Sequence, residues 1–387
     1  MPTDYLPAAR DLDRVLELLE VPPSHYQKAI DRYEAIAAWL SRPESSLLRY
    51  DPRVRCQGSF RIGTATKPLN SDGEYDLDIV VELQLLAHHL ISQKALKKFL
   101  GDELALYAKS KNIAAPIEER KRVWRLHYAD EVSFHIDVLP AIPEYAAFKT
   151  ALAKAGVPAD LAAVALAITC EEHVSYALVS NDWPHSNPAG FAKWFESRMR
   201  AVAAGTIRRL VESRTYASVE AVPAYEWKTP LQRAVQILKR HRDHMFLETP
   251  DLQPISVILT TLSGLAYEGQ ADVLDALTAI LEKMPSLVRS TFPKVPNPVD
   301  PAEDFADKWR KNPALEKSFW TWREQATADV QRFRRGLTTR QLGEHAGAAF
   351  GVTLPESVRP ATPAVAAVAV APTVISSPSR PWGSLRG

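Results

Sequence analysis

Acidic side chains stand inside a segment that otherwise has the composition of a buried β-strand. Residues 74–83 read EYDLDIVVEL, and the tyrosine, valine, isoleucine and leucine in this run favour an extended conformation. Because successive side chains of a strand alternate between its two faces, Asp76 and Asp78 should emerge together on one face. A lone Asp-x-Asp pair is common, but half-buried carboxylates are costly unless they are paired or bound to a metal ion. Since neighbouring carboxylates also raise each other's pKa unless a cation lies between them, the run favours a metal site.

A second strand supplies a third carboxylate. Residues 122–142 have the pattern of a β-hairpin, and the apolar side chains of its second arm should face the core, which leaves Asp137 on the opposite face. If the two strands are neighbours in one sheet, Asp76, Asp78 and Asp137 converge. Oxygen ligands with open coordination positions suit Mg²⁺, with Mn²⁺ as a substitute. Two such ions roughly 3.5 to 4 Å apart would activate an attacking hydroxyl and stabilise a pyrophosphate leaving group.

A glycine and a serine precede the acidic strand. Only 15 of the 387 residues are glycine, so candidates for a phosphate-binding loop are few. In the segment 57–64, QGSFRIGT, Gly58 allows close approach of the backbone to a phosphate, and Ser59 offers N–H and hydroxyl donors. A Gly-Ser pair alone is typical of a surface turn. Its place upstream of the acidic strand makes it a candidate phosphate cradle.

The rest of the chain is predominantly helical. The spacing of apolar residues predicts two helices within 11–50, broken at Pro22 and Pro23, and one each over 84–113, 193–214, 229–247, 254–267, 270–283 and 313–335. Proline-rich connections are expected at 248–254 and 285–301. The last 33 residues, 355–387, are rich in proline and alanine and are expected to be flexible, because they cannot bury a core.

The net charge limits the classes of partner that the chain can bind, and the cysteine content indicates the redox state of its compartment. The chain has 47 Lys and Arg against 46 Asp and Glu, so its formal charge of +1 excludes an overall basic field that would draw it onto nucleic acid or an anionic membrane. Its two cysteines are far apart in sequence, which favours a reducing compartment. Residues 1–10 do not have the pattern of a signal peptide, and the apolar run 364–371 is far shorter than the roughly 20 residues of a membrane helix. We expect a soluble, cytoplasmic protein without a membrane partner.

The histidines are expected to be structural. His88 and His89, and likewise His241 and His244, lie on predicted helices without a third ligand at metal-binding spacing, and no cluster of cysteine and histidine has the spacing of a structural zinc site.

Several segments together carry a resemblance. The sequences GSFRIGTATKP (58–68), EYDLDIVVEL (74–83) and FHIDVLPAIP (134–143) are similar to those of the bacterial CD-NTases, the cyclic-oligonucleotide synthases of anti-phage CBASS systems and relatives of cyclic GMP-AMP synthase and oligoadenylate synthase. The helical segments 230–243, 254–267 and 297–309 resemble that family's C-terminal lobe, so the resemblance covers about residues 50–335.

The resemblance implies an α+β fold and a division into domains. A polymerase-β-like nucleotidyltransferase core, with a mixed sheet and helices, would pack on an oligoadenylate-synthase-like helical lobe, and the active site would lie in the cleft between them. We therefore expect the core with its N-terminal helices at 1–200, the helical lobe at 201–354 and a flexible tail at 355–387.

The resemblance also implies roles for the motif residues. Asp76 and Asp78 would hold two Mg²⁺ ions and the donor triphosphate, and Asp137 would bind the catalytic metal and prepare the acceptor hydroxyl. Gly58 and Ser59 would cradle the donor phosphates.

In the helical lobe the family uses a lysine, and a serine one helix later, against the triphosphate, and Lys239 and Ser256 match these positions. Arg240 and Arg242 are close competitors for the role of the lysine. Val257 stands where the animal sensor has a base-stacking aromatic residue, so base stacking has no candidate.

The implied function is a Mg²⁺-dependent nucleotidyltransferase that joins nucleoside triphosphates, ATP among them, into a cyclic di- or trinucleotide messenger and releases pyrophosphate. The alternatives are an enzyme that makes a linear oligonucleotide or adds terminal nucleotides, and a catalytically silent nucleotide-binding partner of the antitoxin type.

The resemblance also implies partners. They are an effector that reads the cyclic product and either a HORMA-domain activator or a ubiquitin-transfer-like protein that conjugates the chain through Gly387. The sequence leaves the bases, the linkage and the ring size of the product open.

Overall fold

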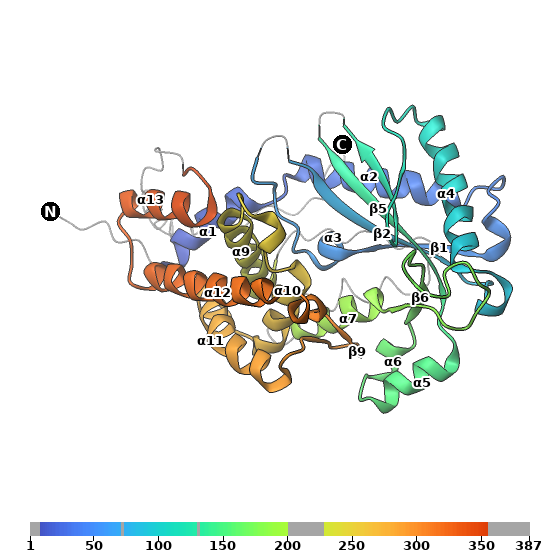
Figure 1. The fold of residues 1–387 in the computed structure, drawn as a ribbon. Coiled ribbons are helices and arrows are strands. Elements are labelled where there is room, and N and C mark those ends of the chain that lie inside the picture. The colour runs from blue at the N-terminus through green and yellow to red at the C-terminus, as the bar shows by residue number, and fades with distance from the viewer. Residues whose placement is uncertain (1–7, 71–72, 130–131, 200–227, 355–387) are drawn as a thin grey trace, which may run out of the picture.

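The fold is α+β, as the sequence predicts, with a mixed sheet and its helices at one end and a group of helices at the other (Figure 1). The computed structural model describes residues 8–70, 73–129, 132–199 and 228–354. The predicted tail 355–387, which includes Gly387, lies outside these ranges, as does most of the helix predicted over 193–214. Among the helices within these ranges, none has both the length and the apolar character needed to cross a membrane.

The described residues form one seven-stranded sheet and one two-stranded sheet. The main path of the large sheet is β1 (Pro52–Gln57), β2 (Tyr75–Leu83), β5 (Phe134–Pro143), β4 (Trp124–Tyr128) and β3 (Glu118–Glu119), with β6 (Leu166–Ile168) beside β5 and β7 (His185–Ser186) beside β6. The small sheet pairs β8 (Pro296–Asn297) with β9 (Asp300–Asp304). Strands β2 and β5 are parallel, whereas the antiparallel pairing of β4 with β5 confirms the hairpin predicted over 122–142.

One face of the large sheet is apolar because the strands alternate. Leu77, Ile79 and Ile136 are fully buried in a core that they share with side chains of α2 (Pro23–Leu40) and α4 (Gln93–Ser110). The polar residues between them therefore point to the other face, as predicted for β2 and β5.

Helix α4 begins later than the sequence pattern predicts. Residues 84–92 form a turn and a short 3₁₀ segment over His88–Leu90 instead of the first part of a helix predicted at 84–113. Ser92 fixes the start, because its hydroxyl accepts a hydrogen bond from the Ala95 N–H at 3.2 Å and so satisfies a free donor of the first turn.

A second hydrophobic core holds the helical lobe. It combines α1 (Ala8–Leu19), α7 (Pro188–Met199), α9 (Pro230–Met245), α10 (Ser256–Ala266), α11 (Val273–Thr291), α12 (Pro313–Arg334) and α13 (Thr339–Phe350). Short helices α5 (Ala146–Lys154) and α6 (Ala159–Ala162) connect β5 to β6, and α3 (Gly58–Ile62) follows β1.

Two features of the lobe differ from the prediction. Helix α11 continues through Pro285 to Thr291, so the connection expected at 285–301 begins later. Met284 and Val288 are buried on either side of the proline, and this burial offsets the loss of one helical hydrogen bond. The sequence pattern did not predict α13, which begins at a capping box in which the Thr338 hydroxyl and the Gln341 side chain bond to each other's backbone N–H.

The domain limits expected at residues 200 and 354 stay predictions, because both adjoin segments outside the description. Within the described residues, the lobe's core recruits α1 and α7 from before residue 200.

Candidate active site

The parallel pairing of β2 with β5 brings the three aspartates together. In this register Asp78 lies beside Asp137, and Asp76 lies beside His135. One carboxylate oxygen from each of Asp76, Asp78 and Asp137 lies within 4.8 Å of the other two. The predicted convergence of the three carboxylates is therefore confirmed as geometry.

The carboxylates of this cluster disfavour each other's ionisation. Burial raises the pKa of Asp78 to about 7, and the charges of Asp76 and Asp137 add to the effect. Burial also raises the pKa of Asp76, again with a contribution from Asp137. A group of oxygen ligands with such unfavourable charge is a ready site for a divalent cation.

Arg125 on β4 is part of this site and was not predicted. Its guanidinium binds Asp137 through two hydrogen bonds, from Nε to Oδ1 at 2.6 Å and from Nη2 to Oδ2 at 2.7 Å. This bidentate pair fixes the plane of the Asp137 carboxylate. Sequence reasoning could have found it, because the hairpin places residue 125 directly opposite residue 137.

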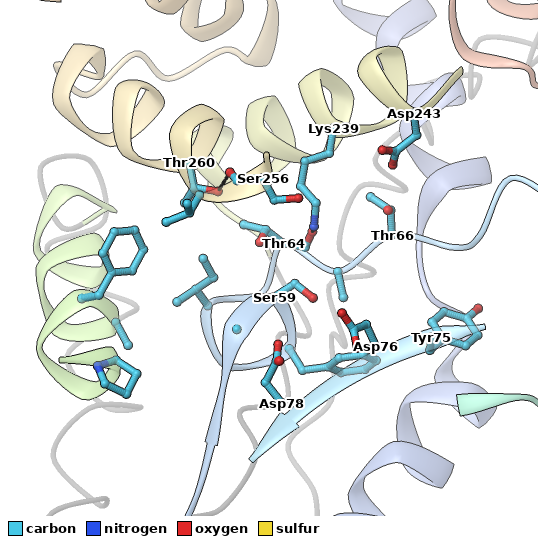
Figure 2. Close-up of a pocket in the computed structure, with 18 of the residues that line it drawn as sticks. Ser59, Thr64, Thr66, Tyr75, Asp76, Asp78, Lys239, Asp243, Ser256 and Thr260 are labelled. Atoms are coloured by element: carbon cyan, nitrogen blue, oxygen red, sulfur yellow. Dashed lines mark hydrogen bonds between the residues drawn. The ribbon is translucent and has the colours of Figure 1, made fainter. Parts of the chain in front are cut away.

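Gly58 meets the acidic strand at very short range. It has a φ of +67°, and a Cβ added to it would lie 2.0 Å from Oδ2 of Asp78. Two features therefore require glycine at residue 58, namely the positive φ of the backbone and the close approach of the carboxylate. Ser59 follows at the start of α3 and lines the same cavity as the aspartates (Figure 2).

Helix α9 faces this acidic group from the other lobe. The Nζ of Lys239 donates a hydrogen bond to the Thr64 carbonyl at 3.1 Å, and Figure 2 shows the lysine reaching from α9 toward Thr64 and Ser59. Burial and the neighbouring Arg242 lower the pKa of Lys239 to about 8, although Asp243, Asp76 and Asp78 oppose this shift.

The same helix anchors the segment after α3. Gln232 and Gln236 donate hydrogen bonds to the carbonyls of Ile62 and Ala65, at 2.9 and 2.7 Å. These contacts hold the Gly58–Ser59 turn at a fixed distance from the helical lobe, and they explain why α9 carries buried polar residues.

Ser256 and Arg242 form one unit. The Nη1 of Arg242 donates to Oγ of Ser256 and to the carbonyl of Pro254, each at 2.9 Å. Both side chains line the cavity. Arg240, the other competitor of Lys239, instead donates from Nη2 to the Lys67 carbonyl at 2.8 Å, and it is not among the described residues that line the cavity.

All four predicted phosphate-binding residues line one cavity of about 580 Å³. Gly58, Ser59, Lys239 and Ser256 share its wall with Asp76 and Asp78, while Asp137, beside Asp78 on β5, is not among the residues of the described ranges that line it. The cavity is formed by the β1–α3 turn, β2, α7, α9, α10 and the β8–β9 region.

The wall away from α9 carries residues to which sequence analysis gave no role. Phe191 and Phe305 line the cavity, and their rings lie edge to face with centroids 6.3 Å apart. Beside them the Nδ2 of Asn297 donates to Oε2 of Glu303 at 2.7 Å. Burial raises the pKa of Glu303. Phe305, Asn297 and Glu303 fall within the segment 297–309 that carried the resemblance, but no spacing rule distinguishes them there.

Histidines of the predicted helices have structural surroundings. His88 is buried against Trp183 and Tyr145, with ring centroids 5.4 and 5.2 Å away, and Nε2 of His241 lies 3.0 Å from Oδ2 of Asp329.

The sequence of the chain is similar to those of known cyclic dinucleotide synthases. Residues 52–141 match the family model for the nucleotidyltransferase domain of cyclic GMP-AMP synthases of the DncV type. The chain is 30% identical over 313 residues to a c-di-GMP synthase of Roseivirga ehrenbergii, covering 80% of this chain and 74% of that protein. It is 29% identical over 331 residues to the cyclic dinucleotide synthase CdnG of Bradyrhizobium diazoefficiens, covering 78% of this chain and 71% of that protein.

Solved structures show the same fold. The structure of B. diazoefficiens CdnG in complex with GTP aligns with a TM-score of 0.64 at 23% identity, over 89% of this chain and 96% of that one. The complex of E. coli MS115-1 CdnC with a HORMA protein contains a chain that aligns with a TM-score of 0.61 at 12% identity, over 90% of this chain and 98% of that one.

Proposed function

Because this chain belongs to the bacterial CD-NTases, nucleotidyltransferases that synthesise cyclic oligonucleotides, we propose that it joins two nucleoside triphosphates into a cyclic dinucleotide and releases pyrophosphate. The observation that carries this proposal is the convergence of Asp76, Asp78 and Asp137 beside a cavity. Asp76 and Asp78 line this cavity, and Lys239 and Arg242 line it from the other lobe. The two relatives are named as synthases of cyclic dinucleotides, which favours a ring of two nucleotides over three.

The donor set of the triad fits a hard divalent cation. It consists of carboxylate oxygens alone, and burial, together with the charges of the other two aspartates, raises the pKa of Asp78. Such a set is typical of Mg²⁺, with Mn²⁺ as its usual substitute. Bound Mg²⁺ would offset the charge of the phosphates and increase the acidity of an attacking hydroxyl.

The protein's own groups would hold the triphosphate between the lobes. Lys239 and Arg242 line the cavity from the helical lobe, where Asp243 pairs with the Arg242 guanidinium. The hydroxyl of Ser256 on α10 and that of Ser59 on α3 offer further donors. Gly58 allows this turn to lie against the acidic strand. Catalysis would then rest on positioning and electrostatics and would need no covalent enzyme intermediate.

Arg125 would hold the carboxylate of Asp137 in a fixed orientation. The two hydrogen bonds from the guanidinium fix the carboxylate plane, so Asp137 can present an oxygen to the cation without rotating. Asp137 would then help to prepare the acceptor hydroxyl through the cation that it holds.

GTP is a proposed substrate beside the ATP expected from the sequence. The carboxylate of Glu303 can accept hydrogen bonds from N1–H and the 2-amino group of guanine, which adenine lacks. Phe191 and Phe305 supply aromatic surface for the base at the same wall. The names of the relatives, a c-di-GMP synthase and a synthase solved with GTP, favour the same base.

A role in defence against phage follows from the family and is part of the proposal. The cyclic product would be read by an effector, and the synthase would be switched either by a HORMA-domain partner or by conjugation through Gly387. Co-expression with neighbouring genes followed by mass spectrometry would reveal an isopeptide-linked adduct that is lost when Gly387 is deleted. A HORMA partner would instead co-purify without a covalent bond.

Product analysis tests the reaction. The purified protein is incubated with all four nucleoside triphosphates and Mg²⁺, treated with phosphatase and analysed by mass spectrometry. We expect a phosphatase-resistant product with the mass of two nucleoside triphosphates less two pyrophosphates, and a requirement for GTP. A product whose terminal phosphates are removed by phosphatase would favour the linear alternative. If the protein binds nucleotide but forms no product, the silent binding partner is favoured.

A further inference from the structure

A second group of metal-ligating side chains lies on the same face of the sheet, one pair of residues away from the aspartates. His135 on β5 is the register neighbour of Asp76, and His127 on β4 is the register neighbour of His135. Glu74 directly precedes β2. One ligand atom from each of Glu74, His127 and His135 lies within 4.8 Å of the other two.

The three side chains already interact as a cluster. The imidazoles of His127 and His135 lie edge to face, with ring centroids 4.7 Å apart, and the Glu74 carboxylate contacts Nε2 of His135. Nε2 of His127 is buried and makes no hydrogen bond within the part of the chain that the structure describes. Its neighbour there is the carboxylate oxygen Oε1 of Glu118, 3.1 Å away.

A further carboxylate supports the cluster from the sheet edge. Oε1 of Glu118 lies 3.1 Å from Nε2 of His127, and the Arg120 guanidinium contacts the other oxygen of Glu118. Glu118 therefore adds a second carboxylate to the group around His127.

The donor chemistry of this cluster differs from that of the aspartates. Two imidazole nitrogens and one carboxylate oxygen suit Zn²⁺ and related transition ions and do not suit Mg²⁺, which prefers oxygen ligands. Three protein ligands leave a coordination position open for water or another group.

We propose that Glu74, His127 and His135 form a second divalent-metal site that takes Zn²⁺ or a similar transition ion. The site would sit beside the acidic triad and would fix Glu74, a residue of the cavity wall, to the central strands. It does not depend on the proposed reaction, because its ligands are distinct from Asp76, Asp78 and Asp137.

Sequence patterns could have found only part of this site. The hairpin predicted over 122–142 places His127 opposite His135. Only the order of strands in the sheet brings Glu74 to them, and two histidines without a third ligand do not indicate a zinc site.

Titration with Co²⁺ tests the proposal, since Co²⁺ substitutes for Zn²⁺ and its visible absorption reports nitrogen ligands and low coordination number. The full chain, stripped with chelator and held in excess Mg²⁺, should bind one equivalent of Co²⁺ with visible absorption bands, and Zn²⁺ should displace it. His127→Gln and His135→Gln should each weaken Co²⁺ binding by about tenfold or more.

Matched variants make the outcome decisive. His89→Gln removes an exposed histidine outside the cluster and should bind Co²⁺ as the wild type does. Asp78→Asn alters the triad alone and should also keep the absorption. Glu74→Gln, at an exposed position, covers the case in which a histidine variant fails to fold, and it too should weaken binding. The proposal is wrong if the wild type binds no Co²⁺ in excess Mg²⁺, if Glu74→Gln and the folded histidine variants bind it unchanged, or if Asp78→Asn alone abolishes the absorption.

Discussion

Gly58 lies so close to Asp78 that a methyl group on its Cα would stand 2.0 Å from the carboxylate oxygen Oδ2. The contact joins the turn after β1 to the acidic strand β2. Because the turn and the carboxylate are in such close contact, any side chain at residue 58 must displace either the turn or Asp78. The scarcity of glycine in the chain gives this position particular weight.

Gly58→Ala should therefore impair the site more than the fold. We expect loss of synthesis of about a hundredfold, because a shift of about 1 Å in a reacting group can cost that much. Gly156→Ala is the matched control, since Gly156 also has a positive φ, of +92°, but nothing lies within 4 Å of the added Cβ. Product formation and thermal melting are measured for both. Equal loss of activity in the two variants would mean that backbone strain, and not contact with Asp78, explains the effect.

The ionisation of Asp78 should appear in stability as well as in activity. Its pKa is raised from 3.8 to about 7 by burial, so the folded state binds more protons than the unfolded state between these values. The protonated Asp78 therefore makes its whole stabilising contribution to the free energy of unfolding below pH 4. This contribution is lost as the pH rises toward 7. In chelator, Asp78→Asn should melt at least about 2 °C above the wild type at pH 8. The difference should shrink as the pH falls.

Mg²⁺ provides the control for that comparison. A cation bound by the triad should raise the melting temperature of the wild type and leave Asp78→Asn nearly unchanged. If Mg²⁺ stabilises both proteins equally, the triad does not hold the ion.

Lys239 should make nucleotide binding sensitive to alkaline pH. Its pKa is lowered from 10.5 to about 8 in the free protein, so above pH 8 the amine is increasingly neutral. The affinity for a non-hydrolysable nucleoside triphosphate should then fall by up to about tenfold per pH unit, because binding must restore the proton. Lys239→Arg, which stays charged, should bind without this loss between pH 8 and 9.5. Parallel pH profiles of the dissociation constant for the two proteins would contradict the role given to Lys239.

Glu303 should set the preference for guanine. Glu303→Gln should lower the selectivity for GTP over ATP by roughly tenfold to a hundredfold, the value of one or two hydrogen bonds to a charged group. The ratio of kcat/KM for the two nucleotides is measured beside that of Glu248→Gln, which changes an exposed glutamate outside the cavity. An unchanged ratio in Glu303→Gln would remove the carboxylate from base recognition.

The site divides into parts that the sequence could and could not predict. Asp76, Asp78 and Asp137 were predictable because strand alternation fixes their faces, and only the neighbouring of β2 and β5 had to be assumed. The places of Lys239 and Ser256 came from resemblance to a family alone. They depend on how α9 packs across the segment 62–67, which no local pattern encodes.

Other differences have local causes. A serine cap delayed the start of α4, and a buried face carried α11 past Pro285. Arg125 was predictable, because the hairpin predicted over 122–142 places it opposite Asp137. Glu303 lies in β9 and Phe305 follows it. Because the residues of this short strand have little strand character, only the folded chain brings the two side chains to the cavity.

The most direct test of the account is incorporation of α-labelled GTP by the wild type and by Asp78→Asn, each with Mg²⁺ and with chelator. The account predicts a labelled, phosphatase-resistant product from the wild type with Mg²⁺ alone, and background from the variant under both conditions although it still folds. Product formation by Asp78→Asn at the wild-type rate would contradict the claim that the three aspartates and a divalent cation carry the reaction.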